Sequence, residues 1–271
     1  MPELPEVETT LQGIKPHIEN QVIENIIIRH HQLRWPIPFT LPQELKGKSI
    51  HKIIRRGKYL LLCIDDGALI IHLGMSGHLR ILTHKTPPKK HDHVDIEFEN
   101  KKVLRFNDTR RFGAVLWIKK NPDQHFLLAK LGPEPLTPNF NSEYLWKRAR
   151  TRKVSIKSFI MDSHIVVGVG NIYAAEALFL AGIHPAKSAK SISLERMEKL
   201  VAAIKKILEQ AIQKGGTTFR DFVNSEGKPG YFANKLNVYG RENLNCIKCD
   251  TKLLMLRIGQ RSTVYCKKCQ K

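Results

Sequence analysis

Four cysteines close to the C-terminus have the spacing of a metal site. They form two C-x-x-C pairs, Cys246 with Cys249 and Cys266 with Cys269, and sixteen residues separate the pairs. Thiolates are ligands that zinc favours, and two such pairs joined by one β-hairpin can close a tetrahedral site. Because sulfur would occupy all four positions, no position is left for a substrate. The spacing therefore predicts one structural zinc ion, with disulfides or free thiols as the alternative.

The N-terminal run Pro2-Glu3-Leu4-Pro5-Glu6 is the second group that could do chemistry. A small residue after the initiator Met usually permits removal of that Met, so the mature chain would begin with the secondary amine of Pro2. An α-amino group has a reference pKa of about 7.7–8.0 and is substantially neutral near physiological pH. Such an amine can attack a sugar carbon and pass to an iminium ion, with Glu3 and Glu6 as general acid and electrostatic partner. The alternative from the residues alone is that Pro and Glu simply begin a helix.

The charge of the chain points to a polyanionic partner. There are 45 Lys and Arg against 25 Asp and Glu in 271 residues, which gives a formal net charge of +20. Hydrophobic residues make up 42% of the chain, so it is not a disordered basic tail. Nucleic acid is the usual partner of a folded protein this basic, although ribosomal and membrane-surface proteins share the property.

Nothing in the sequence indicates a membrane segment or a secretion signal. No run approaches the roughly 18 consecutive apolar residues that a spanning helix needs. The N-terminus is acidic and contains prolines, unlike the basic start of a signal peptide. We therefore expect a cytoplasmic protein with no membrane partner.

The elements that must hold these groups divide into a β-rich part and a helical part. A helix is expected first, from apolar residues at helical spacing: Val7, Leu11, Ile14 and Ile18. From residue 22 to about residue 112, short apolar runs alternate with turn signals such as Asp65-Asp66-Gly67 and Glu99-Asn100-Lys101. Several short strands at this spacing are typical of an antiparallel sandwich or barrel.

Three prolines between residues 131 and 139 mark the boundary between the two parts. Beyond them the pattern predicts helices at Tyr144–Arg150, Ser155–Asp162, Asn171–Ala181 and Ser193–Lys214. The last is the clearest, because one apolar face runs from Leu194 to Ile212 and Gly215-Gly216 can end the helix. The cysteine-bearing tail follows, and its seven basic residues and one acidic residue from Cys246 onward favour contact with a DNA backbone.

Many specific stretches occur in an order that points to one family. They are Pro2-Glu3-Leu4-Pro5-Glu6-Val7-Glu8-Thr9, Arg56-Gly57-Lys58-Tyr59-Leu60, His72-Leu73-Gly74-Met75-Ser76-Gly77, Lys90-His91-Asp92-His93-Val94, Asp108-Thr109-Arg110-Arg111-Phe112-Gly113, Leu131-Gly132-Pro133-Glu134-Pro135-Leu136, Gly168-Val169-Gly170-Asn171-Ile172-Tyr173-Ala174, Gly215-Gly216-Thr217-Thr218 and the four cysteines. In these stretches, over nearly its whole length, the chain resembles the bacterial formamidopyrimidine-DNA glycosylases.

The resemblance implies an α+β fold with an N-terminal helix on an antiparallel β-sandwich domain. A helix–two-turn–helix domain ending in a four-cysteine zinc ribbon would follow. The expected domains are residues 1–131 for the catalytic sandwich, 132–235 for the helical DNA-binding domain and 236–271 for the ribbon. The family would make this a monomer that acts in the bacterial cytoplasm on the nucleoid. Its partner would be double-stranded DNA that contains oxidised purines.

The implied activity is that of a bifunctional DNA glycosylase and AP lyase of base excision repair. It would excise 8-oxoguanine and formamidopyrimidines from duplex DNA through a Schiff base on Pro2, followed by β- and δ-elimination. By the same resemblance Glu3 is the acid that helps to open the deoxyribose ring, Glu6 supports it, and Lys58 acts beside the phosphate of the damaged nucleotide.

The resemblance also implies a set of DNA-binding residues. Met75, Arg110 and Phe112 match the group that enters the duplex and meets the orphaned cytosine, whereas the residue types alone would suggest core Met and Phe with a surface Arg. Positions expected to contact phosphates are His91, Lys157, Asn171 and Arg261. The segment Gly215–Phe222 matches a loop that closes over the flipped base, and Glu176 matches a carboxylate near the active site.

Two other functions remain open at this point. A glycosylase for oxidised pyrimidines of the endonuclease VIII type shares the nucleophile and the ribbon, but the N-terminal motif and the Arg110/Phe112 pair argue against it. A non-catalytic zinc-ribbon DNA-binding protein would explain the charge and the cysteines, but not the N-terminal Pro-Glu pair.

Overall fold

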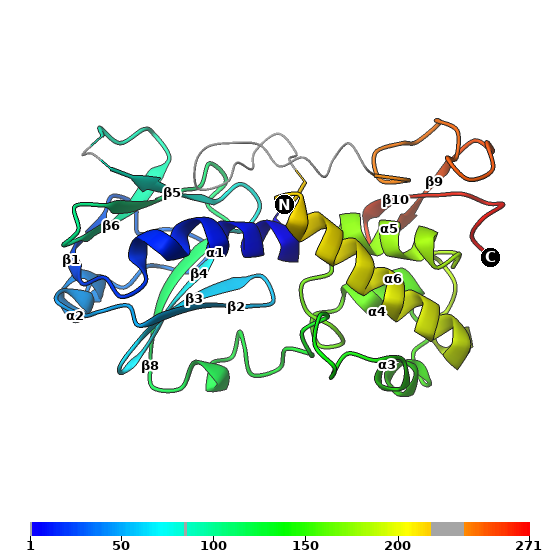
Figure 1. Ribbon diagram of the computed structural model, residues 1–271, viewed down its shortest axis with the longest axis horizontal. Helices are drawn as coiled ribbons and strands as arrows, with labels where there is room; N and C mark the ends of the chain where they lie inside the picture. Colours follow the sequence, from blue (N-terminus) through cyan, green and yellow to red (C-terminus); the bar gives the residue numbers. More distant parts are fainter. Residues whose placement is uncertain (1, 84–85, 218–235) are drawn as a thin grey trace. The chain divides into compact units, whose positions relative to one another are not determined.

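The structure, a computed structural model, describes residues 2–83, 86–217 and 236–271. The chain forms two compact units (Figure 1). The first comprises the chain up to Ala129 together with residues 214–217, and the second comprises Lys130–Gln213 and the described residues from Leu236 to the C-terminus. Each unit has its own hydrophobic core, so each is described by itself.

The first unit opens with helix α1 (Leu4–Ile18). Pro5 lies in the first turn, where a helix can spare its missing N–H. The Glu6 carboxylate accepts the backbone N–H of Glu3 at 2.8 Å and so satisfies one N–H that the helix leaves unpaired. The helix contacts the edge strands of both sheets of the unit, β2 and β5, so its apolar face covers one side of the sandwich. That face is formed by Leu4, Val7, Leu11, Ile14 and Ile18.

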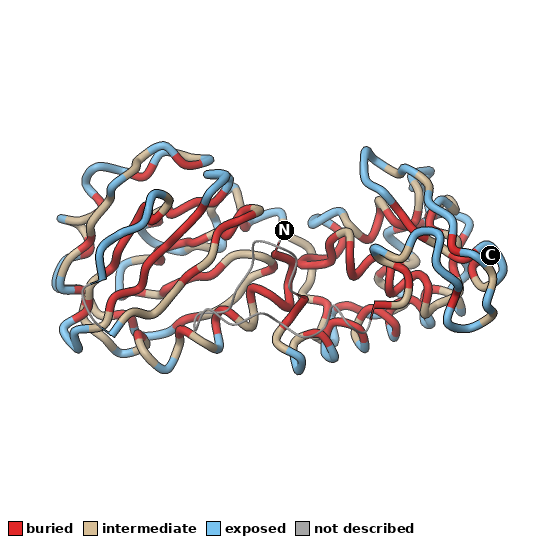
Figure 2. Tube along the Cα trace, turned by 90° about the horizontal axis from the view of Figure 1, so that it is seen from above, coloured by how far each residue is buried: buried red, intermediate tan, exposed pale blue. Residues whose placement is uncertain are grey.

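Two four-stranded antiparallel sheets make up the rest of the first unit. One has the order β1-β6-β7-β5, from β1 (Ile23–Ile28), β6 (Asp92–Phe98), β7 (Val103–Asn107) and β5 (His78–Leu82). The other has the order β2-β3-β4-β8, from β2 (Lys52–Arg56), β3 (Tyr59–Ile64), β4 (Gly67–His72) and β8 (Ala114–Lys119). Short helices α2 (Leu41–Leu45) and η1 (Pro122–Gln124) lie in the connections. Figure 2 shows buried residues along the strands of both sheets.

Alternation along the strands fills one core between the sheets. Leu60, Leu62 and Leu69 from one sheet belong to the same cluster as Ile96 and Leu104 from the other. Fully burying each such side chain contributes roughly 1.5–3 kcal/mol, so this cluster is the main support of the unit. Because successive residues of a strand point to opposite faces of the sheet, the strand residues that alternate with these core residues face away from the core.

Two facing positions on the outer side of β6 and β7, Asp95 and Arg105, form a buried ionic network rather than a solvated surface. The Arg105 guanidinium donates from Nε and Nη2 to the two oxygens of Asp95, each at 2.7 Å, and Arg29 donates to Asp95 at 2.6 Å. Arg105 and Asp95 are 4% and 2% exposed. Burial opposes ionisation of Asp95, but the hydrogen bonds from Arg105 and Arg29 outweigh it and hold the pKa of Asp95 below its usual value.

The second unit is helical. It contains α3 (Ser142–Ala149), α4 (Ile156–Met161), α5 (Asn171–Leu180), the short η2 (Ala189–Ser191) and α6 (Leu194–Gln213). The side chains of Asn141 and Ser155 cap α3 and α4 by accepting backbone N–H groups three residues further on. α5 is buried on almost all sides, since it packs against α4, α6 and β10. It therefore forms the centre of this unit.

A β-hairpin at the C-terminus completes the second unit. Strands β9 (Leu254–Ile258) and β10 (Arg261–Tyr265) pair antiparallel, and both turn residues, Gly259 and Gln260, have positive φ. Ala175 and Phe179 of α5 share a small core with Cys246, Val264 and neighbouring residues of the hairpin. The C-terminal residues return to the turn after α5, where the Gln270 amide donates to the Ile183 carbonyl at 3.0 Å. The hairpin is thus fixed to the helical core at two places.

The α+β fold expected from the sequence is confirmed, with its N-terminal helix, antiparallel sandwich, helical part and four-cysteine hairpin. Leu194 departs from the expected apolar face, since it is 38% exposed as the first residue of α6. α2 was not predicted, because five residues are too few to show a helical period. In the described ranges no helix is long and apolar enough to cross a membrane.

Candidate functional site

The N-terminal group of the first unit is buried. Pro2 is buried and precedes Glu3, the N-cap of α1, and Glu3 and Glu6 are 1% and 2% exposed. Two neighbouring carboxylates can take different protonation states only if their surroundings differ. The structure brings these three predicted residues together because they share one helix start.

The Glu6 carboxylate accepts hydrogen bonds from Glu3 and from Thr217. Its Oε2 accepts the backbone N–H of Glu3 at 2.8 Å, and its Oε1 accepts the backbone N–H and the hydroxyl of Thr217 at 2.8 and 2.9 Å. A carboxylate with its oxygens engaged in this way is suited to fixing geometry rather than to transferring a proton. Glu6 therefore ties the residue after Pro2 to the chain at Thr217.

The glycines before Thr217 allow this contact. Gly215 and Gly216 have φ values of +72° and +79°, in the left-handed region that favours glycine. A Cβ on Gly216 would lie 3.0 Å from Oε1 of Glu6, so a larger residue would press on that carboxylate. Residues 218–222 of the expected base-covering segment lie outside the described residues.

Lys58 stands in the tight turn between β2 and β3. The preceding residue, Gly57, has a φ of +58°. The Gly57 carbonyl accepts a hydrogen bond from the Arg55 guanidinium at 3.0 Å. Arg55 also donates to Glu8 of α1 at 2.7 Å, so the strand that leads to Lys58 is tied to the helix that begins beside Pro2.

His72 is a neighbour of Lys58 that the sequence did not single out. It pairs with Tyr59 across β3 and β4, and its Nδ1 accepts the backbone N–H of Gly74 at 3.1 Å. Burial, followed by repulsion from Lys58 and Arg34, lowers the pKa of His72 to about 4. The imidazole is then neutral at physiological pH with its proton on Nε2, which makes it a donor beside a cation. Its place three residues before Met75, in a motif shared with the family, was the available signal.

Met75, Arg110 and Phe112 come from two loops that meet in space. Met75 lies between β4 and β5, and the other two lie between β7 and β8. Arg110 is exposed and its guanidinium carbon sits 4.9 Å from the centre of the Phe112 ring, which is itself 44% exposed. Met75 and Phe112 line one hollow of about 540 Å³ with Leu33 and Arg34. An exposed aromatic ring and a flexible thioether beside a hollow are unlike core residues and suit insertion between bases.

His91 belongs to a separate cationic hollow on the first unit. Its ring packs edge-on against His93 at 6.2 Å, and His93 lies 5.3 Å from His30. Arg111 approaches His30 at 3.0 Å, and the lining of about 430 Å³ also includes Lys89, Lys90 and Arg29. Several cations around one concave surface suit the binding of a phosphate.

In the second unit, Lys157 is buried rather than presented to solvent. It is 1% exposed, and its Nζ donates to Oδ1 of Asn171 at 2.6 Å and to Oγ1 of Thr263 at 2.7 Å. Lys157 therefore joins α4, the start of α5 and β10. Arg261 is exposed next to the hairpin turn, and with Lys157 it lines a hollow of about 210 Å³. The buried Lys157 orients the Asn171 side chain, and of the two cations Lys157 and Arg261 only Arg261 is exposed.

The Glu176 carboxylate is fully engaged inside the second unit. It is 0% exposed and accepts four hydrogen bonds. Two come from the backbone N–H and the amide of Asn237, at 2.8 and 2.7 Å, and two from the backbone N–H groups of Val238 and Tyr239, both at 2.9 Å. Glu176 thus fixes the chain at 237–239 onto α5.

The four cysteines fit a zinc ion. Their sulfur atoms all lie within 4.8 Å of one another, with 3.8 Å between Cys246 and Cys269 and 3.5 Å between Cys249 and Cys266. A tetrahedron with zinc–sulfur bonds of about 2.3 Å has sulfur–sulfur edges of about 3.8 Å. The predicted ligand set is therefore brought together with the dimensions that one structural zinc ion requires.

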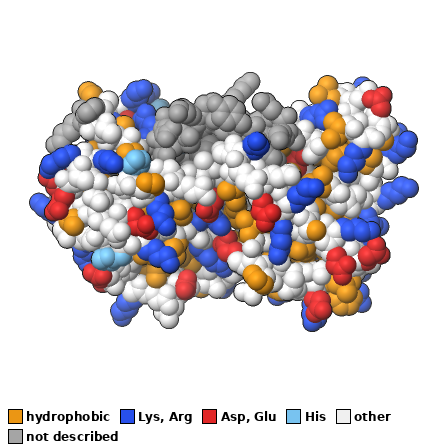
Figure 3. Space-filling view, viewed as in Figure 1, with side chains coloured by type: hydrophobic (Ala, Val, Ile, Leu, Met, Phe, Trp, Pro, Cys, Tyr) orange, Lys and Arg blue, Asp and Glu red, His pale blue; other side chains and the backbone are white. Residues whose placement is uncertain are grey.

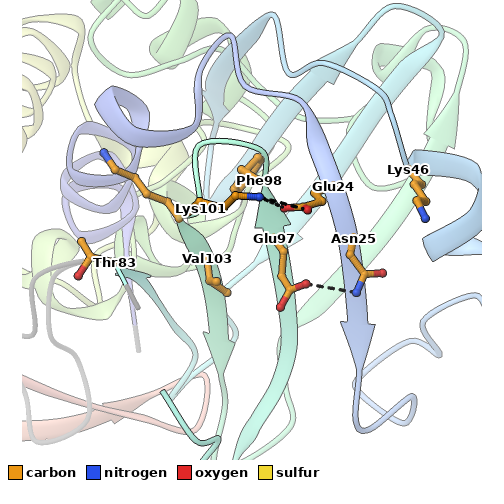
Figure 4. Close-up of a pocket in the computed structure, with 9 residues that line it drawn as sticks. Glu24, Asn25, Lys46, Thr83, Glu97, Phe98, Lys101 and Val103 are labelled. Atoms are coloured by element: carbon orange, nitrogen blue, oxygen red, sulfur yellow. Dashed lines mark hydrogen bonds and ion pairs between the residues drawn. The ribbon is translucent and has the colours of Figure 1, made fainter. Parts of the chain in front are cut away.

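The rest of the described surface carries many charged side chains. Figure 3 shows Lys and Arg side chains on both units, interspersed with Asp and Glu. A hollow of about 570 Å³ on β1, β6 and β7 is lined by polar side chains that contact one another (Figure 4). Lys101 forms an ion pair with Glu24 and the Asn25 amide donates to Glu97, each at 3.3 Å. Such internal pairing is typical of a solvated face.

Comparison with known proteins gives the same family for three parts of the chain. Residues 1–115 match the formamidopyrimidine-DNA glycosylase N-terminal domain and residues 131–223 match the formamidopyrimidine-DNA glycosylase H2TH domain. Residues 244–271 match the zinc finger found in FPG and IleRS.

Similar proteins extend over the full length. The chain is 58% identical over 270 residues to a formamidopyrimidine-DNA glycosylase of Legionella pneumophila, covering 100% of this chain and 98% of the relative. It is 54% identical over 271 residues to that of Marinobacter nauticus, with complete coverage of both. Among solved structures, a Lactococcus lactis FPG mutant in complex with Fapy-dG-containing DNA has a TM-score of 0.92, with 35% identity and full coverage of both chains. The MutM (FPG) protein of Thermus thermophilus has a TM-score of 0.89 and 33% identity, covering 99% of this chain and 98% of that one.

Proposed function

The chain belongs to the formamidopyrimidine-DNA glycosylase family, and from this premise we propose that it excises oxidised purines from duplex DNA and then nicks the abasic strand. The substrates would be 8-oxoguanine opposite cytosine and formamidopyrimidines. The observation that carries the proposal is the N-terminal group, in which Pro2, Glu3 and Glu6 are buried together and Glu6 is locked by Thr217. Once Met1 is removed, Pro2 would offer a buried secondary amine next to two buried carboxylic residues, which suits covalent catalysis better than an ordinary helix start does.

The proposed reaction begins with the neutral amine of Pro2. Its lone pair forms a bond to C1′ of the damaged nucleotide, while the bond from C1′ to the base breaks and the base leaves with that electron pair. The proton that the Pro2 nitrogen then gives up neutralises the departing base and restores the lone pair that later opens the sugar ring. Glu3 donates a proton to the ring oxygen as the sugar opens, which leaves an iminium ion between Pro2 and C1′. Glu6 holds the backbone of Glu3 and so keeps this acid in place.

Strand cleavage would follow from the same iminium ion. Loss of a proton from C2′ expels the 3′ phosphate, and a second elimination expels the 5′ phosphate, before water releases the sugar remnant from Pro2. Lys58, in its tight turn, would contact the phosphate of the damaged nucleotide, and the neutral His72 beside it could donate a further hydrogen bond. The zinc ion would keep the C-terminal hairpin folded and take no part in these steps.

The proposed DNA contacts divide into two kinds. His91, Asn171 and Arg261 would contact phosphates, with Lys157 orienting Asn171. Met75, Arg110 and Phe112 would enter the duplex, with the Arg110 donors facing the acceptors of the orphaned cytosine. The relatives are bacterial proteins, so we also propose action in the bacterial cytoplasm on nucleoid DNA, as a monomer. Residues 1–131, 132–235 and 236–271 are proposed as its domains, supported by the three family matches.

A single-turnover excision assay tests this function. Duplexes carrying 8-oxoguanine opposite cytosine or a formamidopyrimidine should be cleaved to products with phosphate at both new ends, and an undamaged duplex should stay intact. Faster cleavage of a duplex with an oxidised pyrimidine would instead favour the endonuclease VIII type. Binding of every duplex without cleavage would favour a non-catalytic ribbon protein.

A further inference from the structure

The two loops that carry Met75 and the Arg110–Phe112 pair converge on one buried carboxylate, that of Asp108. Asp108 is 0% exposed. Its Oδ1 accepts the Ser76 hydroxyl at 2.6 Å and the backbone N–H of Arg110 at 3.3 Å, and its Oδ2 accepts the backbone N–H of Gly113 at 2.7 Å. The Ser76 oxygen in turn accepts the backbone N–H of Arg110 at 2.9 Å. The Asp108 side chain therefore joins Ser76, the residue after Met75, to Arg110 and Gly113, which lie on either side of Phe112.

The backbone around this carboxylate has little room to move. Gly74 has a φ of +64°, and a Cβ there would lie 2.4 Å from the carbonyl carbon of Phe112. Arg111 has a φ of +57°, which costs a non-glycine residue roughly 1 kcal/mol or more unless its surroundings hold it. The loop is also fixed from the outside, because the ring of His93 hydrogen-bonds to the Asp108 carbonyl at 2.8 Å. The two loops consequently behave as one body with Asp108 at its centre.

We propose that Asp108 is the positioning residue for opposite-base selection: it locks the Met75 loop to the Arg110–Phe112 loop and so fixes the direction in which Arg110 presents its donors. This inference rests on the proposed function, in which Arg110 meets the orphaned cytosine. Asp108 itself is buried and touches no base. To distinguish cytosine from adenine, the Arg110 donors must be held at defined angles to the base. If the loop samples several orientations, the hydrogen bonds no longer distinguish the two bases.

A carboxylate is specifically required at this position. Three donors from two loops reach its two oxygens, and each oxygen has the lone pairs to accept them. Asparagine keeps only one acceptor oxygen, so its NH₂ would face a backbone N–H, either that of Gly113 or that of Arg110, donor against donor. On the Arg110 side the Ser76 hydroxyl would also have to turn its proton away, because it donates to the carboxylate in the wild type. Asp108→Asn should therefore separate the loops at one side while preserving side-chain volume. Ser76→Ala removes only the link through the hydroxyl and should have a smaller effect in the same direction.

The test compares wild type, Asp108→Asn and Ser76→Ala with a matched control, Asp123→Asn, which changes an exposed aspartate in η1 of the same unit. Single-turnover excision of 8-oxoguanine opposite cytosine and opposite adenine gives the selectivity ratio. Cleavage of an abasic site in single-stranded DNA, which has no opposite base, reports the Pro2 chemistry separately. We expect Asp108→Asn to lower the cytosine-to-adenine ratio about tenfold, the factor that corresponds to about 1.4 kcal/mol, with single-strand cleavage within about twofold of wild type. Ser76→Ala should show a smaller loss, and Asp123→Asn none.

Each other outcome has a defined meaning. If Asp108→Asn keeps the wild-type ratio, the inference is overturned and Asp108 serves the fold alone. An equal loss on every substrate also overturns it, because the defect is then general. If Asp108→Asn does not fold, an unchanged ratio in the folded Ser76→Ala variant overturns it as well. A wild-type protein that excises 8-oxoguanine from neither duplex contradicts the proposed function. One that excises it without preferring cytosine opposite the lesion contradicts the role of Arg110 and this inference with it.

Discussion

Replacing Glu176 with Gln should release the chain at residues 237–239 from helix α5. The carboxylate accepts four hydrogen bonds, two on each oxygen, from Asn237, Val238 and Tyr239. Glutamine can keep the two bonds on one oxygen, but its NH₂ faces the other two donors. A hydrogen bond to a charged group is worth about 1.5–3 kcal/mol, so losing two costs at least about 3 kcal/mol locally. Since each 1.4 kcal/mol is a factor of ten, local opening should become at least about 100-fold more frequent.

Amide hydrogen exchange measures this opening directly, because the three backbone N–H groups are themselves the donors. Exchange at 237–239 should accelerate by about two orders of magnitude in Glu176→Gln, while amides of the β-sandwich keep their wild-type rates. Glu198→Gln, at an exposed position of α6, is the matched control and should change nothing. Unchanged exchange at 237–239 in Glu176→Gln would show that the four bonds do not anchor this segment, and the reasoning would fail.

Three further outcomes are expected. Cys249→Ser should bring zinc below about one ion per chain and weaken duplex binding while the sandwich stays folded, and a metal-free protein with full affinity would refute the structural site. Asp95→Asn should cost about 3 kcal/mol in urea unfolding at pH 7. Because the folded pKa of Asp95 is depressed, this stabilisation is present above the unfolded pKa of about 3.9 and must shrink as the pH falls below it, so a pH-independent cost argues against the network. The pKa of His72 is about 4 in the folded protein against 6.5 for a free imidazole. As the pH falls from 6.5 to 4, His72 is therefore protonated in the unfolded chain but not in the folded one, and the free energy of unfolding drops by up to about 3 kcal/mol. His72→Asn should flatten that acid dependence, and an equally steep curve would contradict it.

The sequence predicted those elements that depend on residues close together in the chain. The expected helix Ser193–Lys214 is observed as Leu194–Gln213, because apolar residues at a 3.6-residue period bury one face wherever the helix lies. The turn at Asp65-Asp66-Gly67 joins β3 to β4, and Lys101 in the second predicted turn has a φ of +65°. The spacing of the cysteines likewise predicted their clustering, since each pair and the hairpin between them are local features.

Features that depend on distant contacts could not be read in this way. The order β1-β6-β7-β5 follows from tertiary packing, and alternation along β6 and β7 would have placed Asp95 and Arg105 in solvent, whereas they are buried together. Lys157 was expected as a phosphate contact, but its burial beside Asn171 emerges only when α4, α5 and β10 are assembled. The part played by Asp108 rests on a hydrogen bond to Ser76, 32 residues away in the sequence.

The central claim, that Pro2 is the nucleophile, is tested most directly by locating the covalent bond to the sugar. Borohydride reduction during reaction with an 8-oxoguanine–cytosine duplex should trap the iminium ion as a stable amine, and digestion followed by tandem mass spectrometry should identify the modified residue. The account predicts the sugar remnant on an N-terminal peptide that begins with Pro2, and no adduct from a Pro2→Gly variant. A remnant on Lys58 or Lys157, or equal trapping by a chain that retains Met1, would contradict it.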